Sequence, residues 1–333
     1  MSSTKLKIGE ELIFLSEKDV KLCIDMKKAI ELCEEGELLT GLGEEVDDKF
    51  YLPIKGDLVF KPFAGYLKSK NIVATKIFTV AKNNINKDLP VSSSFGFIYD
   101  VNTLVPIAIL EASWLTGIKV GASSAVAAKY LSKKNSSNIG IIGAGLQGRT
   151  HLAGLNEIFK IKEVKIADIN KEARIRYVKE MSEKYKIDII NVDSIKKAVK
   201  GSDIVITVTT ADEPLIKKEW IEPGMTIIKI GSYQELEYDV VTHVDKLIVD
   251  KWKFISHRTK EIIKLLDEEI ITHKNVYAEL PEIVAGKKSG RENDDESILC
   301  IALGHGADYV TIFSHIYHKA LELGIGKKLN LFK

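Results

Sequence analysis

The sequence predicts an α/β protein in which a domain built on a parallel sheet is joined to a smaller α+β domain. From Asn138 onward, short apolar runs alternate with helical segments, a pattern typical of a parallel sheet with right-handed crossovers. Between residues 51 and 99, β-branched and aromatic runs are separated by glycine, proline or asparagine, which indicates a mostly antiparallel sheet. A length of 333 residues also favours two domains.

The first part of the chain is expected to begin with an amphipathic helix over residues 18–36, because apolar residues recur there at helical spacing and Gly36 follows them. Strands are predicted at 58–60, 72–75, 77–80 and 94–99, and helices at 105–115 and 122–131. The parallel sheet is predicted to use residues 139–142, 164–167, 189–192, 204–207, 226–230 and 246–249, and a last helix covers 310–323.

Composition limits the classes of partner. The net charge is +1 and the charges are interspersed, which argues against nucleic acid or an anionic membrane as the main partner. The three cysteines show no metal-ligand spacing, so no metal is expected. No apolar run near residue 1 is long enough for a signal peptide or a membrane span, so we expect a cytoplasmic protein.

The clearest motif is a glycine-rich turn between a predicted strand and a helix from Arg149 to about Phe159. It reads Gly143-Ala144-Gly145-Leu146-Gln147-Gly148. The first glycine permits a tight turn, the second lets a pyrophosphate approach the backbone, and the third allows close helix–strand packing. The helix N-terminus then directs its free N–H groups at the phosphates. The turn therefore predicts a Rossmann-type domain that binds a dinucleotide.

Asp168 follows the next predicted strand, at the distance expected for an acid that accepts hydrogen bonds from a ribose 2′-hydroxyl. A carboxylate there repels a 2′-phosphate, so NAD is favoured, although Lys171 and Arg174 leave NADP open. Two further strand ends are expected to contact the cofactor, through Thr209 and through Gly231 and Ser232. The alternative for Thr209 and Ser232 is hydrogen bonding to nearby backbone.

Several short motifs stand out by their order and spacing. They are Ala74-Thr75-Lys76, the run Leu115-Thr116-Gly117-Ile118-Lys119, Ser123-Ser124-Ala125, Ala278-Glu279-Leu280, Gly290-Arg291 and Asp308. Together they resemble the ornithine cyclodeaminase/μ-crystallin family. The resemblance implies a substrate-binding and dimerisation domain at 1–131 and 310–333, and an NAD-binding Rossmann domain at 132–309. It also implies a homodimer, bound NAD(H), and chemistry on the Cα–N bond of an amino acid or its imine.

The resemblance also assigns candidate substrate residues. Lys76 matches the catalytic and substrate-binding lysine of the family. Lys55 and Lys119 take positions where the family usually has arginines, and each is either a carboxylate contact or a surface lysine. Asp308 is interpreted either as the N-cap of the last helix or as part of a loop over the cofactor. His305 beside it is either an acid–base group or incidental.

Three functions remain open at this level. The first is an NAD(H)-dependent oxidoreductase of the alanine dehydrogenase or ketimine reductase type. The second is an ornithine or lysine cyclodeaminase, which the loop Gly231–Glu237 disfavours because the family aspartate is absent there and Glu235 is a poor substitute. The third is a non-enzymatic NAD(P)H-binding protein. The sequence does not identify the substrate side chain.

Overall fold

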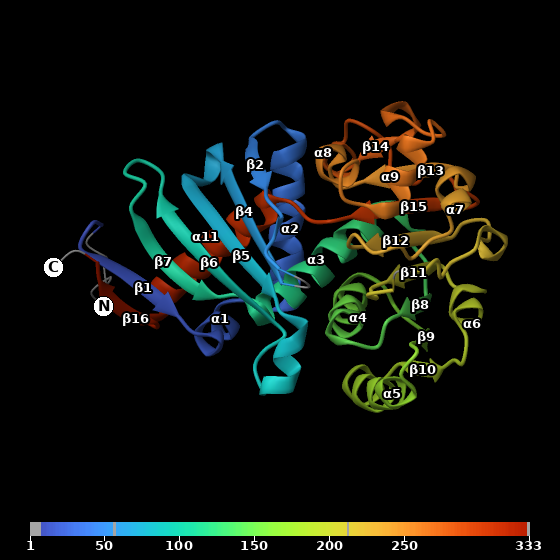
Figure 1. Cartoon of the computed structure of the whole chain (residues 1–333), viewed down its shortest axis with the longest axis horizontal. Coiled ribbons are helices and arrows are strands. Elements are labelled where there is room, and N and C mark those ends of the chain that lie inside the picture. Colours follow the sequence, from blue (N-terminus) through green and yellow to red (C-terminus); the bar gives the residue numbers. More distant parts are fainter. Residues whose placement is uncertain (1–7, 56–57, 212, 332–333) are drawn as a thin grey trace. The chain divides into compact units, whose positions relative to one another are not determined.

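The computed structural model describes residues 8–55, 58–211 and 213–331, and the chain forms two compact units (Figure 1). Unit 1 comprises Met1–Lys119 and His305–Lys333, and unit 2 comprises Val120–Gly304. The predicted α/β class is confirmed. The unit boundaries lie earlier in the chain than the predicted domain boundaries after residues 131 and 309. The first falls inside helix α3 (Ser113–Leu131), whose last residues pack in the core of unit 2.

Unit 1 is built on a sheet with the strand order β16-β1-β7-β6-β5-β4-β2, and β3 also pairs with β4. Its strands are β1 (Glu11–Leu15), β2 (Glu45–Lys49), β3 (Leu52–Pro53), β4 (Val59–Leu67), β5 (Ile72–Val80), β6 (Ser92–Asp100), β7 (Pro106–Glu111) and β16 (Lys327–Asn330). Its helices are α1 (Glu17–Cys23), α2 (Met26–Gly41), η1 (Lys68–Lys70), η2 (Lys82–Lys87) and α11 (Gly306–Leu323). The pairs β4–β5 and β5–β6 are antiparallel, as predicted.

Helix α11 packs on one face of this sheet, where it appears in red behind β5 and β6 (Figure 1). Two glycines allow that contact. A Cβ added to Gly65 would lie 3.0 Å from the backbone of Gly306, and one added to Gly96 would lie 2.5 Å from the ring of Phe313. The two glycines therefore let α11 approach the strands closely at these two positions.

Two sequence predictions for unit 1 are wrong. The expected helix at 18–36 is two helices, because Asp25 caps a new one by accepting a hydrogen bond from the Lys28 N–H. Helix α2 also continues through Gly36, where a Cβ would lie 2.9 Å from Oδ1 of Asp308, so this glycine permits close packing rather than ending a helix.

Residues 105–115 were expected to be helical, but they contain strand β7, which lies between β1 and β6. An apolar run of this length fits a buried strand as well as a helix.

Unit 2 is built on a wholly parallel sheet with the order β10-β9-β8-β11-β12-β15-β13-β14. Its strands are β8 (Asn138–Ile142), β9 (Glu163–Ala167), β10 (Asp188–Asn191), β11 (Ile204–Thr207), β12 (Thr226–Ile230), β13 (Lys246–Val249), β14 (Ala278–Glu279) and β15 (Ile298–Ala302). Its helical segments are α4 (Leu146–Ile158), α5 (Lys171–Tyr185), α6 (Ile195–Val199), η3 (Lys218–Trp220), α7 (Tyr238–His243), α8 (Trp252–Ile255), α9 (Lys260–Asp267), η4 (His273–Asn275) and α10 (Leu280–Val284).

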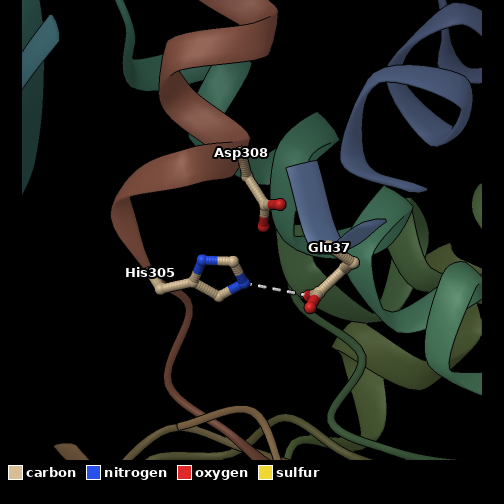
Figure 2. A group of neighbouring side chains, drawn as sticks. All are labelled: Glu37, His305 and Asp308. Atoms are coloured by element: carbon tan, nitrogen blue, oxygen red, sulfur yellow. Dashed lines mark hydrogen bonds and ion pairs between the residues drawn. The ribbon is translucent and has the colours of Figure 1, made fainter. Parts of the chain in front are cut away.

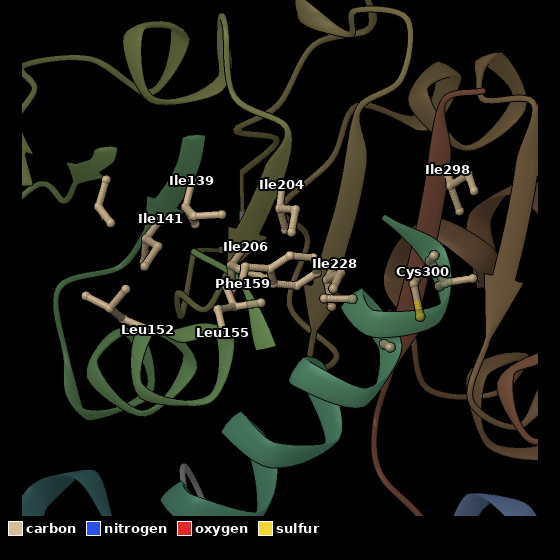
Figure 3. Close-up of a cluster of buried hydrophobic side chains, with 14 of the residues drawn as sticks. Ile139, Ile141, Leu152, Leu155, Phe159, Ile204, Ile206, Ile228, Ile298 and Cys300 are labelled. Atoms are coloured by element: carbon tan, nitrogen blue, oxygen red, sulfur yellow. The ribbon is translucent and has the colours of Figure 1, made fainter. Parts of the chain in front are cut away.

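Buried apolar side chains cover both faces of this parallel sheet. On one face, strand residues such as Ile139, Ile141 and Ile206 pack against Leu152 and Leu155 of α4 (Figure 3). The other face packs against α6, α7 and α9. The strand order reverses between β8 and β11, because β9 and β10 follow β8 on one side and β12 continues from β11 on the other. In such sheets, ligands bind beyond the carboxyl ends of the strands at this switch point.

Within the described ranges, no helix combines the length and the apolar character that crossing a bilayer would require.

Candidate active site

The glycine-rich turn lies at the carboxyl end of β8. Gly143 has φ +117°, a conformation that favours glycine, and its N–H donates to the carbonyl of Ala167 at 2.8 Å. Gly148 lies in the first turn of α4, where an added Cβ would come within 2.1 Å of the Gly143 carbonyl oxygen. These two glycines therefore make the tight turn and the close helix packing that the motif predicts.

Gly145 has a different role from its neighbours. It is the N-cap of α4, and no described heavy atom lies within 4 Å of the position that a Cβ would take. The backbone at the start of the helix is thus open, with its first N–H groups available to an anion. Ala144 is buried beside it, and Leu146 is exposed. This open cradle fits the pyrophosphate of a dinucleotide.

Asp168 is linked directly to the turn. Its Oδ2 accepts a hydrogen bond from the Ala144 N–H at 2.8 Å, and its Oδ1 accepts one from the Asn170 N–H at 2.8 Å. The carboxylate is half-buried at the end of β9, and the guanidinium of Arg174 donates to the Asp168 carbonyl. The acid is therefore fixed next to the glycine-rich turn, as a ribose-binding acid must be.

The end of β11 is tied to a buried glutamate. Oε1 of Glu235 accepts hydrogen bonds from the N–H of Thr209 at 2.8 Å and from its hydroxyl at 2.7 Å, and Oε2 accepts one from the Thr207 hydroxyl at 3.0 Å. Burial raises the pKa of Glu235, and the hydrogen bonds from Thr209 oppose that rise. The Thr209 hydroxyl thus holds the loop after β11 to the loop after β12. It also accepts a hydrogen bond from the Ala211 N–H at 3.1 Å, which is the bonding to nearby backbone that the sequence left as the alternative for this residue.

A second buried pair supports the loop after β12. Lys229 Nζ lies 3.1 Å from Oε2 of Glu261 and donates to the carbonyl of Gly231 at 2.9 Å. Oε1 of Glu261 accepts from the N–H of Glu235 at 2.9 Å. Gly231 has φ +92°, and Ser232 follows it in a half-buried bend. The structure therefore places Gly231 and Ser232 at the same sheet edge as the glycine-rich turn.

The substrate candidates of unit 1 lie on the face of the sheet that packs against α11. Strand register places Lys49 of β2 opposite Phe63 of β4, Phe63 opposite Lys76 of β5, and Lys76 opposite Gly96 of β6. Directly opposite residues share a face. We call these four residues the lysine row. Lys49 and Lys76 are both buried, and their Nζ atoms lie 4.5 and 5.3 Å from the centre of the Phe63 ring.

Lys76 lies in an unusual environment for an amine. It is 2% exposed and its Nζ donates to the hydroxyl of Tyr309 at 2.9 Å. Burial lowers the pKa of Lys76 well below its ordinary value, and the charges of Lys119, Lys49 and Lys61 lower it further. Burial also raises the pKa of Tyr309 to about 12. A neutral amine beside a phenol can accept and return a proton near neutral pH.

Lys119 contacts the same tyrosine but remains charged. Its Nζ lies 2.6 Å from Oδ2 of Asp308 and 5.0 Å from the centre of the Tyr309 ring. Burial alone would lower the pKa of Lys119, but the carboxylate of Asp308 raises it above its ordinary value. Asp308 is not the N-cap of α11, since the cap residue is His305; it lies in the first turn and pairs with Lys119.

Lys55, unlike Lys76 and Lys119, is not buried. It lies in the turn between β3 and β4, where its carbonyl accepts from the Leu58 N–H, and its side chain is exposed. The buried lysine near Lys76 is instead Lys49, which the sequence analysis did not select. Lys49 lies in a run of acidic residues with no recognisable motif, so only the β2–β4 register reveals it.

His305 forms a buried cluster with acids from two other elements. Its Nε2 lies 3.1 Å from Oε1 of Glu37 on α2, and its Nδ1 lies 3.2 Å from Oε1 of Glu45 on β2. Figure 2 shows the imidazole of His305 pointing toward Glu37, with Asp308 close by on the first turn of α11. Burial lowers the pKa of His305, but Glu37, Asp308 and Glu45 raise it well above its ordinary value. The imidazole is therefore charged and holds the start of α11 in place.

The parallel sheet, the open glycine-rich turn and the acid beside it define a Rossmann-class protein that binds a dinucleotide. The chain belongs to the ornithine cyclodeaminase/mu-crystallin family, whose model matches residues 10–324.

Characterised relatives extend over the whole chain. An alanine dehydrogenase from Archaeoglobus fulgidus is 31% identical over 333 residues, which cover 97% of this chain and 99% of the relative. The structure of Thermococcus litoralis Delta(1)-pyrroline-2-carboxylate reductase in complex with NADH and L-proline matches with TM-score 0.91 and 34% identity, covering 95% of this chain and 99% of that one. An archaeal alanine dehydrogenase dimer with bound NAD matches with TM-score 0.91 and 29% identity, covering 97% and 100%.

Proposed function

We propose that this protein is an NAD(H)-dependent oxidoreductase that acts on the Cα–N bond of an L-amino acid or of its imine. The observation that carries the proposal is Lys76, a buried amine with a lowered pKa that is hydrogen-bonded to Tyr309 in a family of such enzymes. The alanine dehydrogenase and pyrroline-2-carboxylate reductase relatives support both the redox chemistry and the use of NAD.

Unit 2 supplies the cofactor site in this proposal. The N-terminus of α4 at Gly145 binds the pyrophosphate, Gly143 and Gly148 shape the turn, and Asp168 accepts hydrogen bonds from the ribose. Backbone of Ala144, Leu146 and Gln147 completes the turn, and the loops at Thr209, Gly231 and Ser232 border it. When bound, NAD(H) supplies or accepts the hydride.

Unit 1 binds and protonates the substrate. Lys49 and Lys119 provide cationic groups for the α-carboxylate, and Asp308 holds Lys119 in place. Lys76 carries the proton to or from the substrate nitrogen, and Tyr309 orients its Nζ. Lys55 is exposed, so the structure favours Lys49 for the second cationic position.

A cyclodeaminase reaction has less support. Glu235 is fully buried and bonded to Thr207 and Thr209, so its carboxylate is committed to the loops. Asp239 lies in the first turn of α7 and pairs with Lys218 at 2.9 Å on the surface. Neither acid supplies the role that the family aspartate has in cyclisation.

Two further properties belong to the same proposal. A homodimer is supported by the archaeal alanine dehydrogenase structure, which contains a dimer. A cytoplasmic location is supported by Cys23, Cys33 and Cys300, which are buried and form no disulfide with one another.

The proposal is tested by following NADH absorbance with purified protein. The assays pair L-alanine with NAD⁺, pyruvate and ammonium with NADH, and Δ1-pyrroline-2-carboxylate with NADH. We expect turnover in the wild type and a loss of about 10²- to 10⁴-fold in Lys76→Met, the range for removing a proton-transfer group. The matched control is Lys82→Met, at an exposed position just beyond β5, which should retain activity.

Other outcomes separate the alternatives. Release of ammonia and proline from L-ornithine without net NADH would assign a cyclodeaminase. Binding of NADH without turnover across the substrate panel would contradict the enzymatic proposal. An unchanged melting curve and NADH affinity in Lys76→Met would show that its loss of activity is chemical.

A further inference from the structure

The amine of Lys76 lies in surroundings that suit a nucleophile as well as a proton carrier. Lys76 is in the middle of β5, and its Nζ lies 4.7, 5.3 and 5.1 Å from the centres of the Tyr309, Phe63 and Phe78 rings. Among the residues that the structure describes, Nζ makes one hydrogen bond, to the Tyr309 hydroxyl, and pairs with no carboxylate. Buried lysines are almost always paired, so this environment indicates a chemical role.

Two other buried lysines of the chain are paired with acids. Lys119 Nζ lies 2.6 Å from Oδ2 of Asp308, and Lys229 Nζ lies 3.1 Å from Oε2 of Glu261. In each pair the carboxylate stabilises the ammonium form of the lysine. Lys76 differs because its partner, among the described residues, is a phenol and not a carboxylate. The ammonium form of Lys76 therefore lacks this stabilisation.

The charges that act on Lys76 indicate the class of ligand. Burial lowers the pKa of Lys76, and the positive charges of three other lysines, Lys119 first among them, lower it further. At pH 7 an ordinary exposed lysine is unprotonated in fewer than about one molecule in a thousand, so only a lysine with a lowered pKa is an effective nucleophile. The positive potential that disfavours the ammonium form also favours an anion at the same place. A ligand that reacts with Lys76 should therefore carry a carboxylate next to its electrophilic carbon.

Tyr309 is placed to assist such a reaction. Lys76 Nζ donates to the Tyr309 hydroxyl at 2.9 Å, so this hydrogen bond does not use the lone pair of the nitrogen. Burial raises the pKa of Tyr309 to about 12, so the phenol keeps its proton near neutral pH and can donate it. An acid is thus held beside any carbonyl carbon that the amine attacks.

We propose that Lys76 is also a nucleophile, whose Nζ forms a reversible imine with the carbonyl carbon of a small 2-oxo acid. Tyr309 is the acid–base group of this step. Desolvated lysines next to other cations are the amines that suit such covalent chemistry. The activity goes beyond the proposed function, because no hydride is transferred and both residues lie in unit 1. It is therefore expected in the full chain without NAD.

The step balances without a further reactant. The Nζ lone pair attacks the carbonyl carbon, a C–N bond forms, and the carbonyl oxygen becomes a hydroxyl by taking, through Tyr309, a proton that the nitrogen loses. The nitrogen lone pair then expels this hydroxyl, which leaves as water with a proton from Tyr309. The protonated imine returns a proton to the phenolate of Tyr309. The net reaction joins the lysine amine to the 2-oxo acid and releases one water.

The test traps the imine by reduction in the purified full-length protein, with no NAD added. Pyruvate and sodium cyanoborohydride are added, and mass spectrometry of the intact chain follows the adduct. Reduction leaves a secondary amine, so the adduct adds the mass of pyruvic acid less one oxygen atom. We expect a single adduct per chain, found in the tryptic peptide 71–82, because trypsin does not cleave after the modified Lys76. Under the same conditions Lys76→Met should carry at least about tenfold less adduct.

Two variants and a second ketone serve as controls. Tyr309→Phe keeps the ring and removes the hydroxyl, so it should slow adduct formation by about 10-fold or more while the adduct stays on Lys76. Lys68→Met, at an exposed position just after β4, should be labelled as the wild type is. Acetone lacks the carboxylate and should give at least about tenfold less adduct than pyruvate.

The outcomes separate this inference from its alternatives. Labelling that is spread over exposed lysines, and equal in the wild type and Lys76→Met, would overturn it. Equal labelling by acetone and pyruvate would overturn the assignment to 2-oxo acids. If Lys76→Met folds poorly, the peptide map of the wild type still identifies the lysine that reacts.

The failure of this inference differs from the failure of the proposed function. An adduct on Lys76 in a protein without NADH-linked turnover would support the inference and contradict the proposed function. NADH-linked turnover without any adduct would contradict the inference and leave the oxidoreductase intact.

Discussion

At the scale of single residues, the site depends on buried charges whose protonation states are set by neighbours from other elements. His305 is fully enclosed by Glu37 of α2, Glu45 of β2 and Asp308 of α11, and is held as an imidazolium. Lys76 is buried among cations and tends to lose its proton. Burial lowers the pKa of both groups, but the net shifts are opposite, because Lys76 is surrounded by cations and His305 by carboxylates.

His305 should make the stability of the fold depend on pH. Its pKa is higher in the folded protein than in the unfolded chain, so its contribution is fully present below about pH 6.5 and is lost as pH rises through the folded pKa. His305→Gln should lower the free energy of unfolding by about 3–5 kcal/mol at pH 6, since it leaves buried carboxylates without the imidazolium. The difference from wild type should shrink at higher pH. Urea unfolding at several pH values measures both effects.

The control for this prediction is His257→Gln, at an exposed position in unit 2. It should behave as the wild type at each pH. A His305→Gln variant as stable as the wild type at pH 6 would show that the imidazole is not charged in the folded protein.

At the scale of elements, neighbouring glycines in one turn have different structural roles. Gly148 packs against the Gly143 carbonyl, whereas Gly145 borders open space at the start of α4. Gly148 is therefore required for packing of the fold, and Gly145 for access of the ligand.

This difference predicts separate effects for two substitutions. Gly145→Ala should leave the melting temperature within about 2 °C of wild type but weaken NADH binding by roughly 10-fold or more, because its methyl group occupies the approach of the pyrophosphate. Gly148→Ala should destabilise the fold by about 1–3 kcal/mol as well, because its Cβ overlaps a backbone oxygen. Thermal melting and fluorescence titration with NADH distinguish the two. Equal destabilisation by both variants would contradict the assignment.

Elements also show where sequence patterns reach their limit. Strands β8 to β13 of the parallel sheet were predicted closely, because they are short apolar runs that alternate with helical segments, whereas β14 and β15 were not predicted. The run at 105–115 was predicted as a helix, although Pro106–Glu111 is strand β7. This segment becomes a strand because it pairs with β1 and β6. The sequence pattern of the segment itself carries no information about those pairing partners.

At the scale of the whole molecule, cofactor and substrate residues belong to different compact units. The glycine-rich turn and Asp168 lie in Val120–Gly304, and the lysine row lies in Met1–Lys119 with α11 in His305–Lys333. Each ligand should therefore stabilise mainly the unit that holds its site.

Hydrogen exchange should reveal this division. NADH at a hundredfold excess over its Kd should add about 2.7 kcal/mol to the free energy of unfolding, with new protection concentrated at residues 139–149, 163–168 and 204–211. A substrate carboxylate should protect β4, β5 and the first turn of α11 instead. Protection by NADH centred on β4 and β5 would contradict the assignment of the cofactor site to unit 2.

The sequence by itself determined the class of fold and the cofactor half of the site. The glycine-rich turn and Asp168 are close in the chain and obey local geometric rules, so their spacing carries the information. The resemblance named Lys76 and Lys119 for the substrate half, but only the tertiary structure brought them together with Lys49 and Tyr309. Lys49 and Lys76 come from two strands, while Lys119 and Tyr309 come from two helices. Their proximity depends on strand register and on the packing of α11, which arise from contacts far apart in the chain.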